Sequence, residues 1–145
     1  MITIKHIEEN DFEQLAALFL EFATFQKQPK KMKNSAAKMR SEKDFIHGFI
    51  ARDENDRIIG YTTFFFAYYT WIGKSLYMDD LYIKEKYRGK GIGTLLIKEV
   101  IKYAEKEKCD RLRWQVSQWN EHAISFYKSL GAEIDETERN CDITF

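Results

Sequence analysis

Residues 76–93 read LYMDDLYIKEKYRGKGIG, and this stretch indicates both how the chain folds and where its chemistry lies. An apolar, aromatic run typical of a buried strand contains two adjacent carboxylates, Asp79 and Asp80. A loop with three glycines follows, and an amphipathic segment begins at Gly91. Burying a carboxylate costs several kcal/mol unless a partner compensates the charge. The stretch therefore predicts a strand, a glycine loop and a helix that build a site as well as a core.

Around this stretch the sequence predicts one α/β domain over residues 1–145, a twisted mixed sheet flanked by helices. Residues 49–69 are expected to form two strands joined by a turn at Asn55–Asp56. Further strands are expected over residues 2–7, 74–84, 111–117, 132–136 and 140–145. Helical spacing of apolar residues predicts helices over 10–26, part of 27–43, 91–106 and 120–130. Strands come together early and then alternate with helices, which is typical of a mixed sheet.

The charge balance excludes several classes of protein. Lys and Arg number 23, as do Asp and Glu, so the net charge is zero and argues against a general nucleic-acid or membrane-surface binder. The basic run Lys27–Lys33 is interpreted as a solvated loop.

Cys109 and Cys141 lack the spacing of metal ligands, so no metal is expected. A reduced cytoplasmic protein is favoured, although a disulfide between the two cysteines stays open. The N-terminus lacks the apolar core of a signal peptide, and no apolar run approaches ~18 residues.

The glycine loop, residues 88–93, suits either an anionic ligand or a tight turn. The first amides of a helix lack internal partners and lie at the positive end of the helix dipole, so phosphates can bind there. The alternative is a turn that only permits close packing of strand on helix. Gly-Lys-Ser/Thr of a P-loop is absent, and Thr94 stands where the dinucleotide pattern needs its third glycine.

Residues 88–93 resemble the R-x-x-G-x-G pyrophosphate loop of the GNAT N-acetyltransferase superfamily, which binds acetyl-CoA. Residues 119–133, WNEHAISFYKSLGAE, resemble its later helix, which opens with Asn and carries a Tyr. Residues 61–83 are most similar to the spermidine/spermine branch, and the resemblance covers 58–133 well. It implies the GNAT fold, acetyl-CoA as co-substrate, a small amine as acceptor, and a homodimer.

The resemblance also implies roles for individual residues. Asp79 matches the base that acts through water, usually a Glu, and Tyr127 matches the Tyr that protonates the departing thiolate. Amides around Leu81–Ile83 would receive the oxyanion, where the acetyl-pantetheine arm pairs with the strand. The implied acetyl-CoA contacts are Leu81, Tyr82, Ile83, Arg88, Gly89, Lys90, Gly91, Ile92, Gly93, Thr94, Asn120, Ala123 and Tyr127.

The chemistry itself asks for such groups, because an alkylamine with a pKa near ~10.4 must lose a proton before it attacks. Strand alternation places Asp79 and Asp80 on opposite faces unless a bulge intervenes. Asp80 could assist the base or bind the cation of the substrate. Alternatively, one carboxylate pairs with Arg111 or Arg113. Tyr127 could instead pack its ring in the core and leave its hydroxyl in water.

The acceptor is less defined than the reaction. A polyamine site should be lined with acids, yet residues 21–31 read EFATFQKQPKK, with Glu21 followed by lysines. The acceptor is therefore a diamine, polyamine, lysine-like amino acid or another small primary amine. Expected substrate contacts are Phe25, Gln26, Asp79, Asp80, Arg113, Trp114 and Gln115. Two alternatives remain, a non-catalytic acyl-CoA-binding regulatory module and a protein lysine or N-terminal acetyltransferase.

Overall fold

The computed structural model describes residues 1–145, which divide into two compact units, residues 1–114 and residues 115–145. The strands are β1 (Thr3–His6), β2 (His47–Arg52), β3 (Ile58–Tyr69), β4 (Gly73–Ile83) and β5 (Arg111–Trp114). The α-helices are α1 (Phe12–Phe25), α2 (Ala36–Ser41), α3 (Ile92–Lys106) and α4 (Glu121–Ser129). Short 3-10 helices are η1 (Glu9–Asp11), η2 (Pro29–Lys31), η3 (Lys43–Phe45) and η4 (Glu85–Tyr87).

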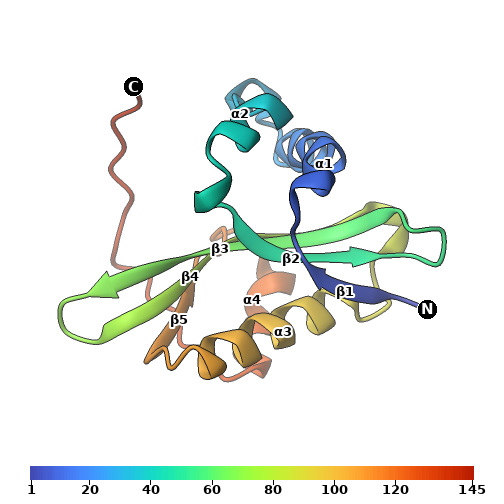
Figure 1. Ribbon diagram of the computed structural model, residues 1–145. Helices are drawn as coiled ribbons and strands as arrows, with labels where there is room; N and C mark the ends of the chain where they lie inside the picture. Colours follow the sequence, from blue (N-terminus) through green and yellow to red (C-terminus); the bar gives the residue numbers. More distant parts are fainter. The chain divides into compact units, whose positions relative to one another are not determined.

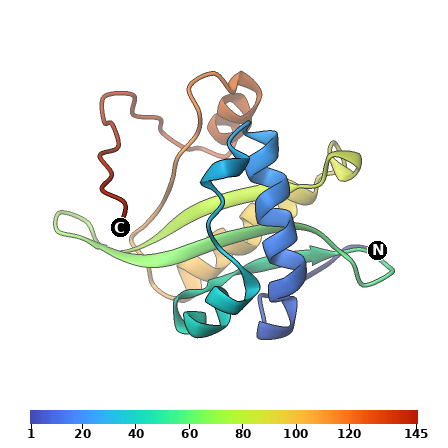
Figure 2. The ribbon, with the colours of Figure 1, turned by 90° about the horizontal axis from the view of Figure 1, so that it is seen from above.

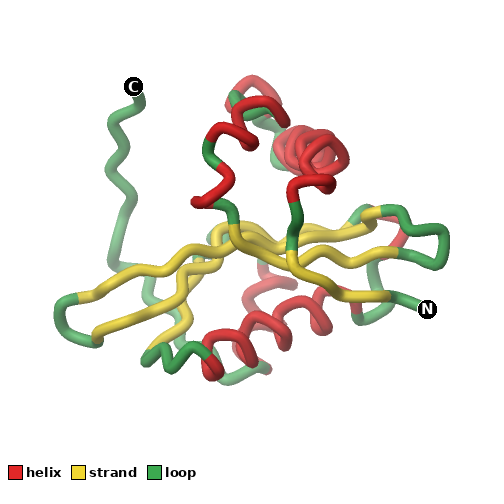
Figure 3. Tube along the Cα trace, in the orientation of Figure 1, coloured by secondary structure: helices red, strands yellow, loops and turns green.

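The first unit is a five-stranded sheet with helices on both faces (Figures 1 and 3). Its strands follow the order of the sequence, antiparallel from β1 to β4 and parallel between β4 and β5. Helices α1 and α2 cover one face and α3 covers the other, and Figure 2 shows α1 crossing over the strands. The predicted mixed sheet flanked by helices is confirmed.

Apolar side chains explain why helices pack on both faces. Leu15 of α1 and Tyr61 of β3 are fully buried on one side, and Leu96 and Val100 of α3 on the other. Their burial follows from helical spacing, which gathers apolar residues into one stripe per helix. Each of these side chains stabilises the fold by about 1.5–3 kcal/mol relative to an exposed position.

Strand β4 departs from regular pairing at the acidic pair, Asp79 and Asp80. Asp80 lies opposite Thr63 and Met78 lies opposite Phe64, so Asp79 is an extra residue in a β-bulge. The hydroxyl of Thr62 donates to the backbone oxygen of Asp80 at 2.8 Å. On the other side, β5 pairs with β4 only from Ser75 to Met78. The β4 edge from Asp79 onward therefore has no strand beside it.

The second unit contains one helix, α4, which confirms the helix predicted over 120–130. The side chain of Asn120 accepts a hydrogen bond from the backbone N–H of Ala123 at 3.2 Å and caps the helix.

The strands predicted over 132–136 and 140–145 are wrong, because neither segment forms a strand, and β5 ends at Trp114 rather than at residue 117. Polar side chains explain the difference. Asp135 accepts from both the backbone N–H and the hydroxyl of Thr137, which turns the chain instead of extending it. Residues 132–145 are also mostly exposed, so little apolar burial favours a strand.

Candidate active site

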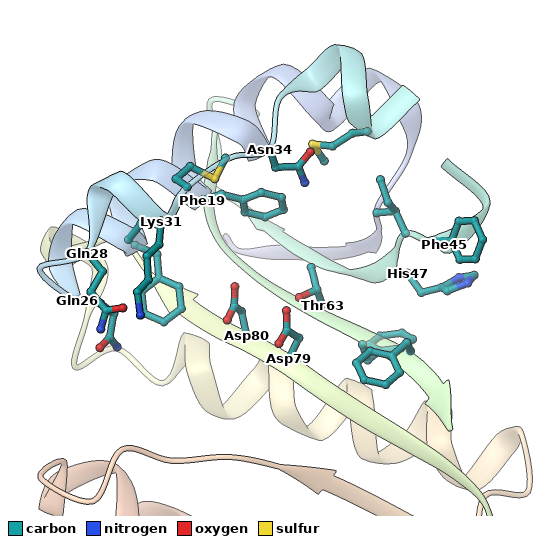
Figure 4. A pocket seen from close by; sticks show the side chains of 17 residues that line it. Phe19, Gln26, Gln28, Lys31, Asn34, Phe45, His47, Thr63, Asp79 and Asp80 are labelled. Atoms are coloured by element: carbon teal, nitrogen blue, oxygen red, sulfur yellow. The ribbon is translucent and has the colours of Figure 1, made fainter. Parts of the chain in front are cut away.

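A pocket of about 470 Å³ lies between the α1–α2 layer and the sheet of the first unit (Figure 4). Its aromatic walls come from α1 and β3, and its floor includes the bulge of β4. The lining residues are Phe19, Phe22, Ala23, Gln26, Gln28, Lys31, Met32, Asn34, Met39, Phe45, Ile46, His47, Thr63, Phe64, Phe65, Asp79 and Asp80. An apolar pocket of this size with a few convergent polar groups is typical of a small-molecule site.

The bulge brings both carboxylates of the acidic pair into this pocket. Regular alternation would place Asp79 and Asp80 on opposite faces, but the extra residue cancels that alternation locally. Figure 4 shows both side chains rising from β4 toward the helical layer. Both acids therefore line the same pocket, which unbroken alternation would prevent.

Partial desolvation in the pocket raises the pKa of both carboxylates, although Asp79 is exposed and Asp80 is half-buried. Desolvation first, and then the charge of Asp79, raises the pKa of Asp80 from 3.8 to about 6, while a hydrogen bond from Tyr61 opposes the rise. The Tyr61 hydroxyl donates to Asp80 Oδ2 at 3.4 Å. Desolvation also raises the pKa of Asp79. Carboxylates tuned in this direction are better proton acceptors near neutral pH than ordinary surface acids.

The alternative of an ion pair with arginine is not favoured. No ion pair joins Asp79 or Asp80 to Arg111 or Arg113. Both guanidinium groups lie over the ring of Tyr69, at 4.3 and 5.0 Å from its centroid. The acidic pair therefore keeps its charge available to a ligand.

Only some of the expected substrate contacts line this pocket. Gln26, Asp79 and Asp80 do, whereas Phe25, Arg113 and Trp114 do not, and Gln115 belongs to the second unit. Phe25 lies beneath the guanidinium of Arg88, which is 4.5 Å from the Phe25 ring centroid.

Sequence reasoning missed several lining residues that lie far from the glycine loop in sequence, among them Lys31, Asn34, His47 and Thr63. The composition of Lys27–Lys33 predicts a solvated loop, and only the fold shows that Lys31 lines a pocket. Pro29 within that run was the one available sign of an ordered turn, because it starts η2.

The glycine loop presents free backbone amides at the start of α3. Gly91 is the N-cap residue with φ 79° and provides no side-chain cap, and Gly89 has φ 77°. A Cβ at either position would meet nothing within 4 Å, so open space adjoins the loop. Tyr87, just before the loop, donates its hydroxyl to Asp53 at 3.0 Å and ties the loop to the β2–β3 turn.

Arg88 holds the loop against the free edge of β4. Its Nε donates to the backbone oxygen of Ile83 at 2.8 Å. The unpaired edge at Leu81–Ile83, the open glycines and the uncapped helix start together fit a ligand with an extended polar arm and an anionic end. Acetyl-CoA has this chemistry.

In the second unit, Asn120 caps α4 and Tyr127 lies two turns further along the helix. Desolvation raises the pKa of the Tyr127 phenol, so it stays protonated at neutral pH.

None of the helices is long and apolar enough to cross a membrane.

Comparison with known proteins identifies the family. Residues 12–132 match the profile of the Acetyltransferase (GNAT) family. The chain is 34% identical to the thialysine N-epsilon-acetyltransferase of Bos taurus, covering 94% of this chain and 86% of that protein. It is 29% identical to spermidine/spermine N(1)-acetyltransferase-like protein 1 of Homo sapiens, covering 89% of this chain and 20% of that protein. The fold matches an aminoglycoside acetyltransferase from a soil metagenomic sample, with TM-score 0.81 and 18% identity over 99% of this chain and 96% of that one. This protein belongs to the GNAT family of acetyltransferases, an N-acetyltransferase family that uses acetyl-CoA.

Proposed function

We propose that the protein transfers the acetyl group of acetyl-CoA to a primary amine of a small molecule, such as a lysine-like amino acid or a short diamine. The observation that carries the proposal is the paired carboxylate of the β4 bulge inside a pocket of about 470 Å³. A pocket of this size suits a small molecule, whereas a protein substrate needs an open groove. The thialysine acetyltransferase among the relatives supports the same class of acceptor.

The carboxylates would prepare the amine for attack. Asp80, deeper in the pocket, would bind the ammonium, and Asp79, at the exposed side, would accept its proton through a water molecule. Acetyl-CoA supplies an acetyl thioester. In the overall exchange an N–C bond replaces the C–S bond, the amine becomes an amide, the thiol is released and one proton remains for the solvent.

Other groups of this chain would serve the leaving group and the donor. Tyr127, kept protonated by its raised pKa, would donate its proton to the departing sulfur. Amides at Leu81–Ile83 would stabilise the developing oxyanion. The glycine loop would hold the pyrophosphate through Arg88, Gly89, Lys90, Gly91, Ile92, Gly93 and Thr94, while Asn120 and Ala123 would contact the arm.

A CoA-release assay over a panel of amines tests this function. The panel contains lysine, thialysine, ornithine, putrescine, spermidine, an aminoglycoside and a lysine peptide. Turnover is expected with the small amino acids and short diamines and not with the peptide. Calorimetric binding of CoA without acetylation of any amine would instead favour a regulatory module, and turnover with the peptide alone would favour a protein acetyltransferase.

The homodimer, the cytoplasmic location and the single domain stay predictions. Sedimentation equilibrium measures the first, localisation of a tagged protein measures the second, and a single cooperative unfolding transition by two probes supports the third.

A further inference from the structure

Lys31 is the only lysine or arginine that lines the pocket, and Asp79 and Asp80 are its only acids. Figure 4 shows Lys31 reaching from the helical side toward the sheet, while the two carboxylates reach from the sheet toward the helices. The pocket therefore has a cationic wall and an anionic wall. A ligand that fits both must carry both charges.

The position of Lys31 is fixed by the backbone of its loop. Lys31 ends η2, and its N–H donates to the oxygen of Gln28 at 3.0 Å. The N–H of Gln28 in turn donates to the oxygen of Ala23 at 2.8 Å, which ties the loop to the end of α1. Pro29 restricts the same turn further. This geometry places Lys31 at the exposed rim of the pocket, where its side chain lines the pocket and also meets solvent.

The charge of Lys31 is not neutralised within the protein. Lys31 takes part in none of the ion pairs or side-chain hydrogen bonds. Glu21, the acid that a polyamine site would use on α1, is engaged elsewhere. It accepts from the Tyr82 hydroxyl at 2.7 Å, lies 3.8 Å from Lys84 Nζ and does not line the pocket.

We propose that Lys31 selects acceptors that carry a carboxylate in addition to the reacting amine, a specificity that rests on the proposed function of this pocket. The amine lies at Asp79 and Asp80, the aliphatic stem lies along the rings of Phe19 and Phe22, and the carboxylate pairs with Lys31. A diamine or polyamine would place a second ammonium beside Lys31, and like charges in a partly desolvated pocket repel.

Matched acceptors that differ only in the α-carboxylate isolate this effect. Lysine is compared with cadaverine, and ornithine with putrescine, as kcat/KM for acetylation. The wild-type protein is expected to prefer the amino acid of each pair. Lys31→Met should lower kcat/KM for the amino acids about 2- to 5-fold, the value of an ion pair at an exposed lysine, without lowering it for the diamines. Lys31→Glu should reverse the preference.

Lys30→Met is the matched control, because Lys30 is its neighbour in η2 but does not line the pocket. It should leave both members of each pair unchanged. Equal losses for amino acid and diamine in Lys31→Met, or no loss for either, would overturn the role of Lys31.

Calorimetry with lysine and cadaverine, without acetyl-CoA turnover, separates this inference from the proposed function. Tighter binding of lysine that disappears in Lys31→Met supports the role of Lys31 even if no amine is acetylated, an outcome that would refute only the transferase proposal. Binding of cadaverine as tight as that of lysine, or of neither, would overturn the inference itself.

Discussion

Asp80→Asn is expected to stabilise the protein while impairing its activity. The folded state raises the pKa of Asp80 from 3.8 to about 6. At about 1.36 kcal/mol for each tenfold change in proton affinity, ionised Asp80 costs the fold up to about 3 kcal/mol. Asn carries no charge and retains an acceptor for the Tyr61 hydroxyl. We therefore expect the free energy of unfolding to rise by about 1–3 kcal/mol at pH 8.

The pH dependence distinguishes this cause from a general packing effect. Because the pKa is raised, the folded chain binds the proton more tightly than the unfolded chain between pH 3.8 and about 6. Stability from this group is present below pH 3.8 and is lost as the pH rises through 6. Asp80→Asn should accordingly stabilise at pH 8 and have little effect at pH 4.

Urea unfolding at both pH values measures this difference. Asp44→Asn is the control, because Asp44 is exposed and takes part in no ion pair, and it should change little at either pH. A variant at position 80 that is less stable at pH 8, or equally stabilised at pH 4 and pH 8, would refute the reasoning. The expected combination of gained stability and lost turnover is typical of a residue retained for function.

Three further predictions concern the reaction and its donor. Tyr61→Phe removes a hydrogen bond that lowers the pKa of Asp80. The acidic limb of the pH profile of kcat/KM, expected near pH 6, should therefore move to higher pH. An unshifted limb would contradict control of this limb by Asp80. Tyr127→Phe should lower kcat about 100-fold in the CoA-release assay, with little change in acetyl-CoA affinity measured by calorimetry. Unchanged turnover at every pH would exclude Tyr127 as a proton donor. Gly91→Ala places a side chain on a residue with φ 79°. We expect it to lower the free energy of unfolding in urea by about 1–2 kcal/mol and to weaken CoA binding in calorimetry. Wild-type values for both would contradict the role of the loop.

The sequence predicts the elements around the site because each leaves a periodic or conformational signal. Apolar spacing locates α1 and α3, and the glycine at position 91 marks the start of α3, where the left-handed backbone needs it. The adjacent carboxylates in an apolar strand likewise indicate a site before any fold is known.

Other features leave no such signal. A β-bulge is one extra residue in a pairing. The two adjacent carboxylates indicate a site but do not say that the pairing shifts there, so only the register with β3 reveals the bulge. Lys31 belongs to a polar run whose composition is that of a solvated loop, and its position depends on hydrogen bonds to Ala23 and Gln28. Residues 132–145 alternate like strands, but side-chain bonds at Asp135 turn the chain instead.

Transfer of an isotopically labelled acetyl group from acetyl-CoA to lysine tests the central claim most directly. Mass spectrometry of the product identifies which atom carries the label, and Asp79→Asn is assayed in parallel. We predict label on the terminal nitrogen with the wild-type protein and a large loss of turnover, at nearly intact CoA binding, with Asp79→Asn. The account would be contradicted if CoA bound but label reached no small-molecule amine, or if Asp79→Asn turned over as fast as the wild type.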